Sequence, residues 1–122
     1  MSEAILQRAV ARVLDHSGLL WCHVPNGGQR NVIVAAKLKG EGVKPGVPDV
    51  LVFAPITTEP SGMLIHNGLA IELKNGKKGR TSQHQKMWMG QLERHGWRVA
   101  VCHNLDEALA VLRECYPNKF PQ

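Results

Sequence analysis

The first pattern in the chain is a run of apolar residues at helical spacing. Residues 3–16 place these side chains three and four positions apart, which predicts an amphipathic helix. The apolar positions are Ile5, Leu6, Ala9, Val10, Val13 and Leu14. Ser2 is placed to cap the start of this helix, and Gly18 is placed to end it.

Two further helices are expected in the second half of the chain. The first begins at Thr81 or Ser82 and runs to about His95. Its apolar side holds Met87, Trp88 and Leu92. The second opens at Asn104, where Glu107 follows three residues later in a capping-box pattern.

Short apolar runs bounded by turn residues predict the strands. They are Leu19–Val24, Asp49–Ala54, Leu69–Lys74 and Arg98–Cys102. Pro55–Gly68 is rich in turn residues and is expected to be a surface connection, across which the second and third strands pair as an antiparallel hairpin. Asn31–Lys39 fits either a helix or an extended loop. The resulting order, α-β-β-β-α-β-α, belongs to the α/β class.

The composition is that of an ordinary globular domain. The chain has 122 residues, 43% of them hydrophobic and 20% charged, so we expect residues 1–122 to form a single domain. No apolar run approaches the roughly 20 residues that span a bilayer, and the N-terminus lacks a secretory pattern. The three cysteines, Cys22, Cys102 and Cys115, form no C-x-x-C pair. They are expected to be small buried side chains in a cytoplasmic protein.

Basic residues are concentrated in two segments. The formal net charge is +5, and residues 74–86 contain five basic and no acidic side chains. Residues 27–48 add four basic residues and one acidic residue. Such a local excess indicates a polyanionic partner such as DNA, although charge alone fits a solvated basic loop equally well. The candidate DNA contacts are Arg30, Lys37, Lys39, Lys44, Lys77, Lys78, Arg80 and Lys86.

Three polar positions on two strands suggest chemistry rather than packing. Glu72 and Lys74 lie two residues apart on one strand, so they share a face, while Leu73 points to the other. Asp49 opens the strand that is expected to run antiparallel to it, which can bring the two carboxylates together. Two carboxylates and the Leu73 carbonyl offer the oxygen ligands that Mg²⁺ or Mn²⁺ prefers. A neighbouring lysine can orient water or stabilise charge on a phosphate.

Each of these residues also has a plainer interpretation. Asp49 follows Pro48 and fits a turn, and E-x-K spacing is common on exposed strands. What distinguishes this chain is the combination: Gly46-Val47-Pro48-Asp49, an apolar strand, Ile71-Glu72-Leu73-Lys74, and then a basic loop and a helix.

With these motifs the sequence resembles the VRR-NUC domain of the PD-(D/E)xK nuclease superfamily. The matching segments are Pro25-Asn26-Gly27-Gly28, Gly46-Val47-Pro48-Asp49, Ile71-Glu72-Leu73-Lys74 and Ser82-Gln83-His84-Gln85, followed by Trp88, Leu92 and Gly96. The resemblance covers about residues 3–115. It implies a restriction-endonuclease-like αβββαβ core with a mixed central sheet flanked by helices.

The resemblance also implies roles for individual residues. Asp49 and Glu72 would be the metal ligands, with the Leu73 carbonyl, and Lys74 would be the catalytic lysine. Gln85 would be the active-site glutamine, although its spacing from Ser82 also fits a capping box. Glu3 would be a further candidate ligand from the first helix, or else an exposed glutamate favoured by the helix dipole.

The activity implied is that of an Mg²⁺- or Mn²⁺-dependent endodeoxyribonuclease. Stand-alone members of this family resemble homodimeric Holliday-junction resolvases and are often carried by phages, so branched DNA and a second copy of the chain are the expected partners. The amphipathic residues 3–16 and the apolar residues 63–65 are candidate self-association surfaces, or else plain core. The alternatives are a non-catalytic DNA-binding module on the same fold, a flap nuclease or nickase, and a small-molecule phosphohydrolase.

Overall fold

The helices and strands of the chain alternate along most of its length. The computed structural model describes residues 2–25, 31–75 and 80–121. The helices are α1 (Glu3–Ser17), α2 (Val32–Gly40), α3 (Gln83–Arg94) and α4 (Leu105–Cys115). The strands are β1 (Trp21–His23), β2 (Val50–Val52), β3 (Ile56–Thr57), β4 (Leu64–His66), β5 (Leu69–Leu73) and β6 (Arg98–Cys102). This agrees with the α/β class expected from the sequence.

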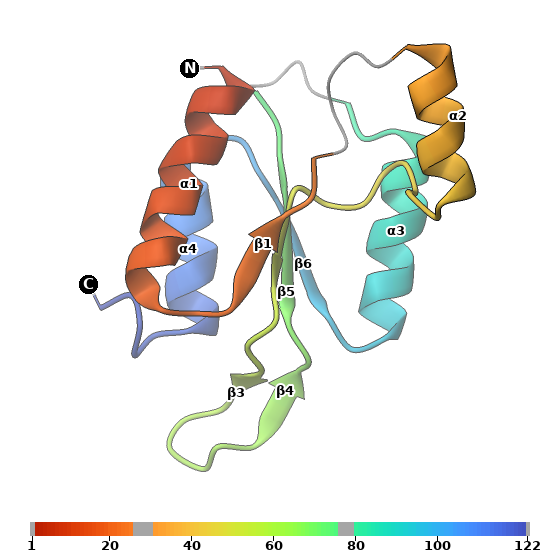
Figure 1. Cartoon of the computed structure of the whole chain (residues 1–122). Coiled ribbons are helices and arrows are strands. Elements are labelled where there is room, and N and C mark those ends of the chain that lie inside the picture. Colours follow the sequence, from red (N-terminus) through yellow and green to blue (C-terminus); the bar gives the residue numbers. More distant parts are fainter. Residues whose placement is uncertain (1, 26–30, 76–79, 122) are drawn as a thin grey trace.

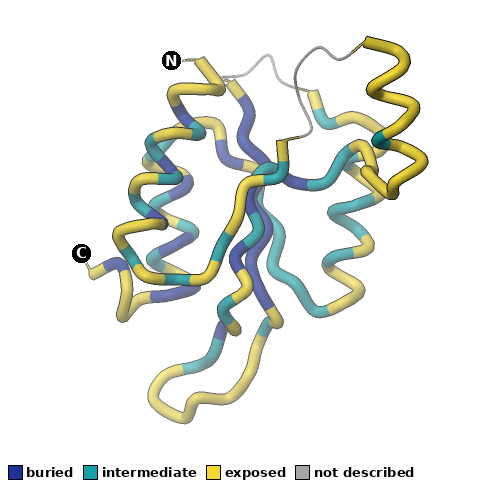
Figure 2. Tube along the Cα trace, in the orientation of Figure 1, coloured by how far each residue is buried: buried dark blue, intermediate teal, exposed yellow. Residues whose placement is uncertain are grey.

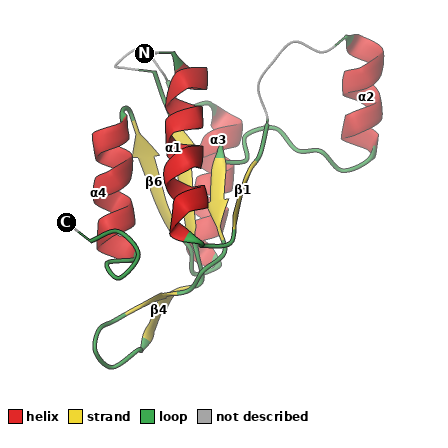
Figure 3. Ribbon diagram, turned by 60° about the vertical axis from the view of Figure 1, so that its left-hand side comes forward, coloured by secondary structure: helices red, strands yellow, loops and turns green. Residues whose placement is uncertain are grey.

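A four-stranded mixed sheet forms the centre of the molecule. Its strand order is β1-β2-β5-β6, in which only the pairing of β5 with β6 is parallel. Helices α1 and α4 lie together on one face of the sheet, and α3 covers the other (Figure 1). Helix α2 lies beyond α3 and projects away from the sheet (Figure 3). The fold is therefore the helix-flanked mixed sheet that the resemblance implies.

The register between β2 and β5 determines which polar residues meet. The two strands are antiparallel, and Val50 pairs with Ile71. The residue before Val50 is Asp49 and the residue after Ile71 is Glu72, so the two carboxylates face each other at one end of the sheet. The antiparallel pairing predicted from the sequence is confirmed.

The core lies between the sheet and the helices on each face. Helix α1 contributes Leu6, Val10 and Leu14, each with no more than 2% of its surface exposed. All five residues of β5 are buried, because this strand has a neighbour on both sides and helices above and below (Figure 2). The apolar residues Leu6, Val10 and Leu14 of α1 are thus core residues, which is the plainer of the two expectations for this helix.

Polar caps end the helices largely as predicted. The Ser2 hydroxyl accepts a hydrogen bond from the Ile5 amide, and Gly18 ends α1 with a φ of 78°. Ser82, rather than Thr81, caps α3. Asn104 caps α4 by accepting from the Glu107 amide.

Several local expectations differ from the structure. Pro55–Gly68 contains the small hairpin of β3 and β4 rather than a plain connection. The ambiguous segment after Asn31 is helix α2. Cys22 and Met87, expected to be covered, are both exposed. Within the described residues, no helix is long and apolar enough to cross a membrane.

Candidate active site

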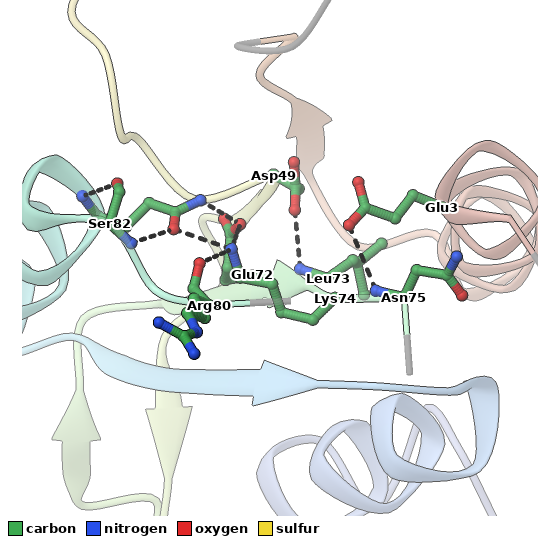
Figure 4. Close-up of polar contacts among 9 residues, drawn as sticks. Glu3, Asp49, Glu72, Leu73, Lys74, Asn75, Arg80 and Ser82 are labelled. Atoms are coloured by element: carbon green, nitrogen blue, oxygen red, sulfur yellow. Dashed lines mark hydrogen bonds and ion pairs between the residues drawn. The ribbon is translucent and has the colours of Figure 1, made fainter. Parts of the chain in front are cut away.

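Asp49 and Glu72 meet at the end of the sheet that also holds the start of α1 and the start of α3 (Figure 4). The Leu73 amide donates a hydrogen bond of 2.7 Å to Asp49 Oδ2, which holds this carboxylate against β5. The pairing of Val50 with Ile71 places Asp49 opposite Glu72 in the register of the two strands. The pairing of β2 with β5 is therefore what assembles the site.

Lys74 is enclosed by three acceptors. Its Nζ lies 2.9 Å from Gln85 Oε1 and 3.1 Å from the Arg80 carbonyl oxygen. Glu72 Oε2 lies 3.4 Å away and completes an ion pair. The ammonium group is therefore held by two hydrogen bonds and one ion pair. The side chain is consequently held in one orientation, with only 7% of the residue exposed.

Gln85 connects the start of α3 to both charged side chains. Its Oε1 accepts hydrogen bonds from Lys74 Nζ and from the Ser82 amide, both at 2.9 Å. Its Nε2 donates a bond of 2.6 Å to Glu72 Oε2. The amide orientation follows from chemistry, because ammonium and N–H groups only donate and the carboxylate accepts. Gln85 therefore caps α3 and also contacts the charged pair, and its role in catalysis stays a prediction.

The surroundings of the two carboxylates favour their neutral forms. Burial, and then the negative charge of Asp49, raise the pKa of Glu72 to about 7. Burial also raises the pKa of Asp49 above its usual value, against the lowering effect of the hydrogen bond from the Leu73 amide. A buried and a half-buried carboxylate that resist ionisation together form a site where a nearby positive charge is strongly favoured.

The donor set fits a small divalent cation. Glu72 Oε1 is buried and has no hydrogen-bond partner among the described residues, so this oxygen is left for a ligand. Hard carboxylate oxygens are the ligands that Mg²⁺ and Mn²⁺ prefer. Throughout residues 2–25, 31–75 and 80–121, no three His, Cys, Asp or Glu side chains gather closely enough to hold a metal ion. A cation here would thus need further oxygens from the backbone, water or substrate.

Glu3 lies near the carboxylate pair without joining it as a third member. Its Oε1 accepts a hydrogen bond of 3.3 Å from the Asn75 amide, so the first turn of α1 is attached to the end of β5. Its negative charge contributes to the raised pKa of Asp49. The side chain is exposed rather than carried into the core, and its role as a ligand stays a prediction.

A cleft of about 350 Å³ opens beside Asp49, between α1 and the end of β1. Gln7, Arg8 and His23 line it together with Glu3. His23 Nδ1 lies 2.7 Å from the Asp49 carbonyl oxygen, and because a carbonyl only accepts, this nitrogen must carry the hydrogen. Sequence analysis missed Gln7 and Arg8, whose positions one turn after Glu3 on the same helix were the available signal.

The predicted DNA contacts are spread around the start of α3. Lys39 and Lys44 line a cavity of about 630 Å³ that also borders α3 at His84. Lys37, Arg80 and Lys86 are exposed. The remaining three predicted contacts, Arg30, Lys77 and Lys78, lie outside the described residues.

The fold is a nuclease-type fold. Its mixed sheet is flanked by helices and brings an aspartate and a Glu-x-Lys pair together at one end. The family model of the VRR-NUC domain matches residues 1–105, and the chain therefore belongs to this family, a branch of the PD-(D/E)xK nuclease superfamily. A solved structure named "VRR_NUC domain protein" superposes with a TM-score of 0.73 at 21% sequence identity, covering 96% of this chain and 89% of the other. That likeness shows a common fold. Comparison with curated proteins gave no match.

Proposed function

We propose that the protein is an Mg²⁺- or Mn²⁺-dependent endodeoxyribonuclease that hydrolyses phosphodiester bonds in branched DNA. The observation that carries this proposal is the contact network of Glu72, Lys74 and Gln85 beside Asp49, with Glu72 Oε1 left unpaired in a buried position. Membership of the VRR-NUC family supports the same assignment.

Asp49 and Glu72 would hold the cation, with the Leu73 carbonyl as a further oxygen and Glu3 as a neighbouring carboxylate. A bound divalent cation supplies Lewis-acid polarisation of the phosphate and lowers the pKa of coordinated water. Lys74 would exchange one of its three acceptors for the attacking water or a non-bridging phosphate oxygen. Gln85 would meanwhile keep the ammonium beside Glu72, since its oxygen and nitrogen contact both side chains.

The basic surface around α3 would hold the DNA backbone. Lysine and arginine contacts to phosphates position a protein on DNA without reading its sequence. A structure-selective enzyme needs such contacts on more than one arm of its substrate. The proposed contacts include Lys39, Lys44 and Arg80, which approach α3 from separate segments of the chain.

A homodimer is the working unit we propose for junction cleavage. One chain offers one Asp49–Glu72–Lys74 set, whereas resolving a four-way junction needs two symmetric cuts, which a two-fold dimer provides. Met63, Leu64 and Ile65 in the β3–β4 hairpin have 68%, 56% and 50% of their surface exposed, and this apolar hairpin surface is available for self-association. A reducing cytoplasm, containing the host DNA if the protein is phage-encoded, is the compartment we propose.

The test is cleavage of labelled four-way junction, flap and linear duplex DNA in Mg²⁺, Mn²⁺ or EDTA, combined with sedimentation at micromolar concentration. We expect paired cuts in the junction, no cutting in EDTA and the mass of a dimer. Cutting of flaps or single strands by a monomer would replace the resolvase proposal with a flap nuclease or nickase. Binding without cutting in either metal would make the protein a non-catalytic DNA-binding module.

A further inference from the structure

The loop that carries Asp49 packs directly against the first turn of α3 at Gly46. This glycine has a φ of +90°, and a Cβ built on it would lie 2.6 Å from both the Cβ and the carbonyl oxygen of His84. Real Cβ atoms do not approach other atoms so closely, so any side chain at this position must displace His84. His84 is the immediate neighbour of Gln85, so the contact at Gly46 determines where the site glutamine sits.

The N-cap of α3 holds the same turn from the other side. The Ser82 hydroxyl accepts a hydrogen bond of 3.1 Å from the Gln85 amide, and the Ser82 amide donates one of 2.9 Å to Gln85 Oε1. Both bonds end on the residue that contacts Lys74 and Glu72. A capping box ordinarily satisfies only helix-end groups, but here its glutamine is also part of a buried charged network.

We infer that Gly46 and Ser82 are positioning residues of the proposed nuclease, acting through Gln85 to hold Lys74 and Glu72 in their reactive arrangement. This inference rests on the proposed function for its kinetic consequence. Gly46 permits the close approach of α3 to the Asp49 loop, and Ser82 determines the orientation of the Gln85 amide. Neither residue touches the carboxylates itself. Their effect is geometric, and displacement of a catalytic group by about 1 Å can reduce turnover about 10²-fold.

Gly46→Ala is the first test, and Gly42→Ala is its matched control. Gly42 has a φ of +102°, so alanine there suffers the same backbone strain, but no heavy atom lies within 4 Å of its added Cβ. We expect Gly46→Ala to lower kcat about 10²-fold and to change KM far less, because displacement of His84 moves Gln85 and through it the reactive groups. Gly42→Ala should keep the kcat of the wild type. Equal kcat losses in the two variants would show that backbone strain, rather than the His84 contact, is responsible, and would overturn the role of Gly46.

Ser82 variants separate the two bonds at the N-cap. Ser82→Ala removes the hydroxyl and keeps the amide that contacts Gln85 Oε1. Ser82→Pro removes the amide donor as well as the hydroxyl acceptor, and the φ of −73° at this position suits proline. We expect kcat to fall slightly in Ser82→Ala, strongly in Ser82→Pro, and not at all in Ser82→Thr, which keeps both bonds. Wild-type kcat in folded Ser82→Pro would overturn the role of Ser82.

A spectroscopic measurement tests the inference without relying on cleavage. The Gln85 side-chain amide is expected to give a distinct ¹⁵N–¹H signal, because one hydrogen is donated to Glu72. This signal, assigned by its loss in Gln85→Leu, should move in Gly46→Ala and Ser82→Pro and stay in place in Gly42→Ala. If the wild type does not cut DNA, the proposed function fails. The same measurement still tests whether Gly46 and Ser82 position the Gln85 side chain. An unmoved Gln85 signal in both folded variants would overturn the inference.

Discussion

Charged side chains usually lie at the surface and large apolar ones in the core, but the end of β5 and helix α2 depart from this rule in opposite directions. At the end of β5, Glu72 and Lys74 are charged side chains with only 4% and 7% of their surface exposed. In α2, Val32 and Ile33 are large apolar side chains with 84% and 82% exposed. Charged residues inside and apolar residues outside are the two observations about burial that carry information about function.

The difference lies in what compensates each violation. Burying a charge is costly unless hydrogen bonds and an opposite charge replace its water, and the Lys74–Gln85–Glu72 network provides these. Within the described part of the chain, no residue of α2 is buried. At the end of β5, the charged side chains contact one another, and only Glu72 Oε1 lacks a hydrogen-bond partner among the described residues. The apolar side chains of α2, by contrast, add little to the stability of the fold.

The largest expected effect comes from removing one carboxylate at the end of β5. Asp49→Asn or Glu72→Gln should lower cleavage by about 10³-fold or more, because each removes an anionic oxygen that the proposed cation needs. DNA binding in EDTA should survive or improve, since repulsion of phosphate is reduced. Initial-rate cleavage and fluorescence anisotropy measure the two effects. Near-normal turnover by either variant, with contaminating nuclease excluded, would show that the carboxylates at the end of β5 do not take part in cleavage.

Lys74→Met should remove turnover while leaving metal affinity largely intact. A protonated lysine cannot ligate a cation, so the role proposed for Lys74 concerns water or phosphate, and loss of such a group costs about 10²–10³-fold. Isothermal titration with Mn²⁺ distinguishes the two effects. Collapse of Mn²⁺ affinity in the variant would instead make Lys74 an organiser of the carboxylates.

Neutralising the basic loop should weaken binding without changing sequence preference. We expect the triple change of Lys77, Lys78 and Arg80 to Gln to lower affinity for all duplexes, because phosphate contacts carry no sequence information. Each lost contact should reduce the slope of log K against log salt by roughly 0.9. Binding titrations from low to moderate salt measure this slope. An unchanged slope would place the DNA surface elsewhere, for example on the lysines of α2.

The free energy of unfolding is expected to depend on pH through the carboxylates at the end of β5. The pKa of Glu72 is raised to about 7 in the folded protein, so the folded state holds its proton more tightly than the unfolded state. In EDTA, the contribution of Glu72 to the free energy of unfolding should be fully present below about pH 4.5. This contribution should be lost as the pH rises through about 7. The raised pKa of Asp49 acts in the same direction.

Glu72→Gln isolates this contribution. It should flatten the decline between about pH 5 and pH 8, and it should be more stable than the wild type at the upper end, as measured by urea unfolding in EDTA. Adding Mg²⁺ should stabilise the wild type more than the variant. A parallel decline in both proteins would show that other groups cause it.

The smallest effect on stability is expected in α2. Replacing Val32 and Ile33 with Ser should change the free energy of unfolding by no more than about 0.5 kcal/mol, as is usual for surface positions. Ile71→Ala in the buried strand β5 is the contrasting variant and should cost about 2–5 kcal/mol. Urea unfolding at one pH compares the two. A loss of several kcal/mol in the α2 variant would show that these apolar side chains do support the fold.

Much of the fold followed from local patterns. β6 has the bounds Arg98–Cys102 that its apolar run predicts, and α1 begins after the predicted cap. These elements could be predicted because their own residues carry a regular period and clear end signals. The β3–β4 hairpin was missed because its strands have two and three residues, too few to show a period among turn-forming neighbours.

The candidate site was likewise predicted in part from local patterns. The sequence by itself determined that Asp49, Glu72 and Lys74 lie at strand ends and that Glu72 and Lys74 share a face, because a strand alternates its side chains with a period of two. Only the tertiary structure decided that Gln85 serves both the cap and the charged pair, that the Arg80 carbonyl holds Lys74, and that Gly46 lies against His84. The Gly46–His84 contact joins segments that are distant in sequence. The contacts of Lys74 with Arg80 and Gln85 depend on how α3 packs on the sheet, for which no local pattern of residues exists.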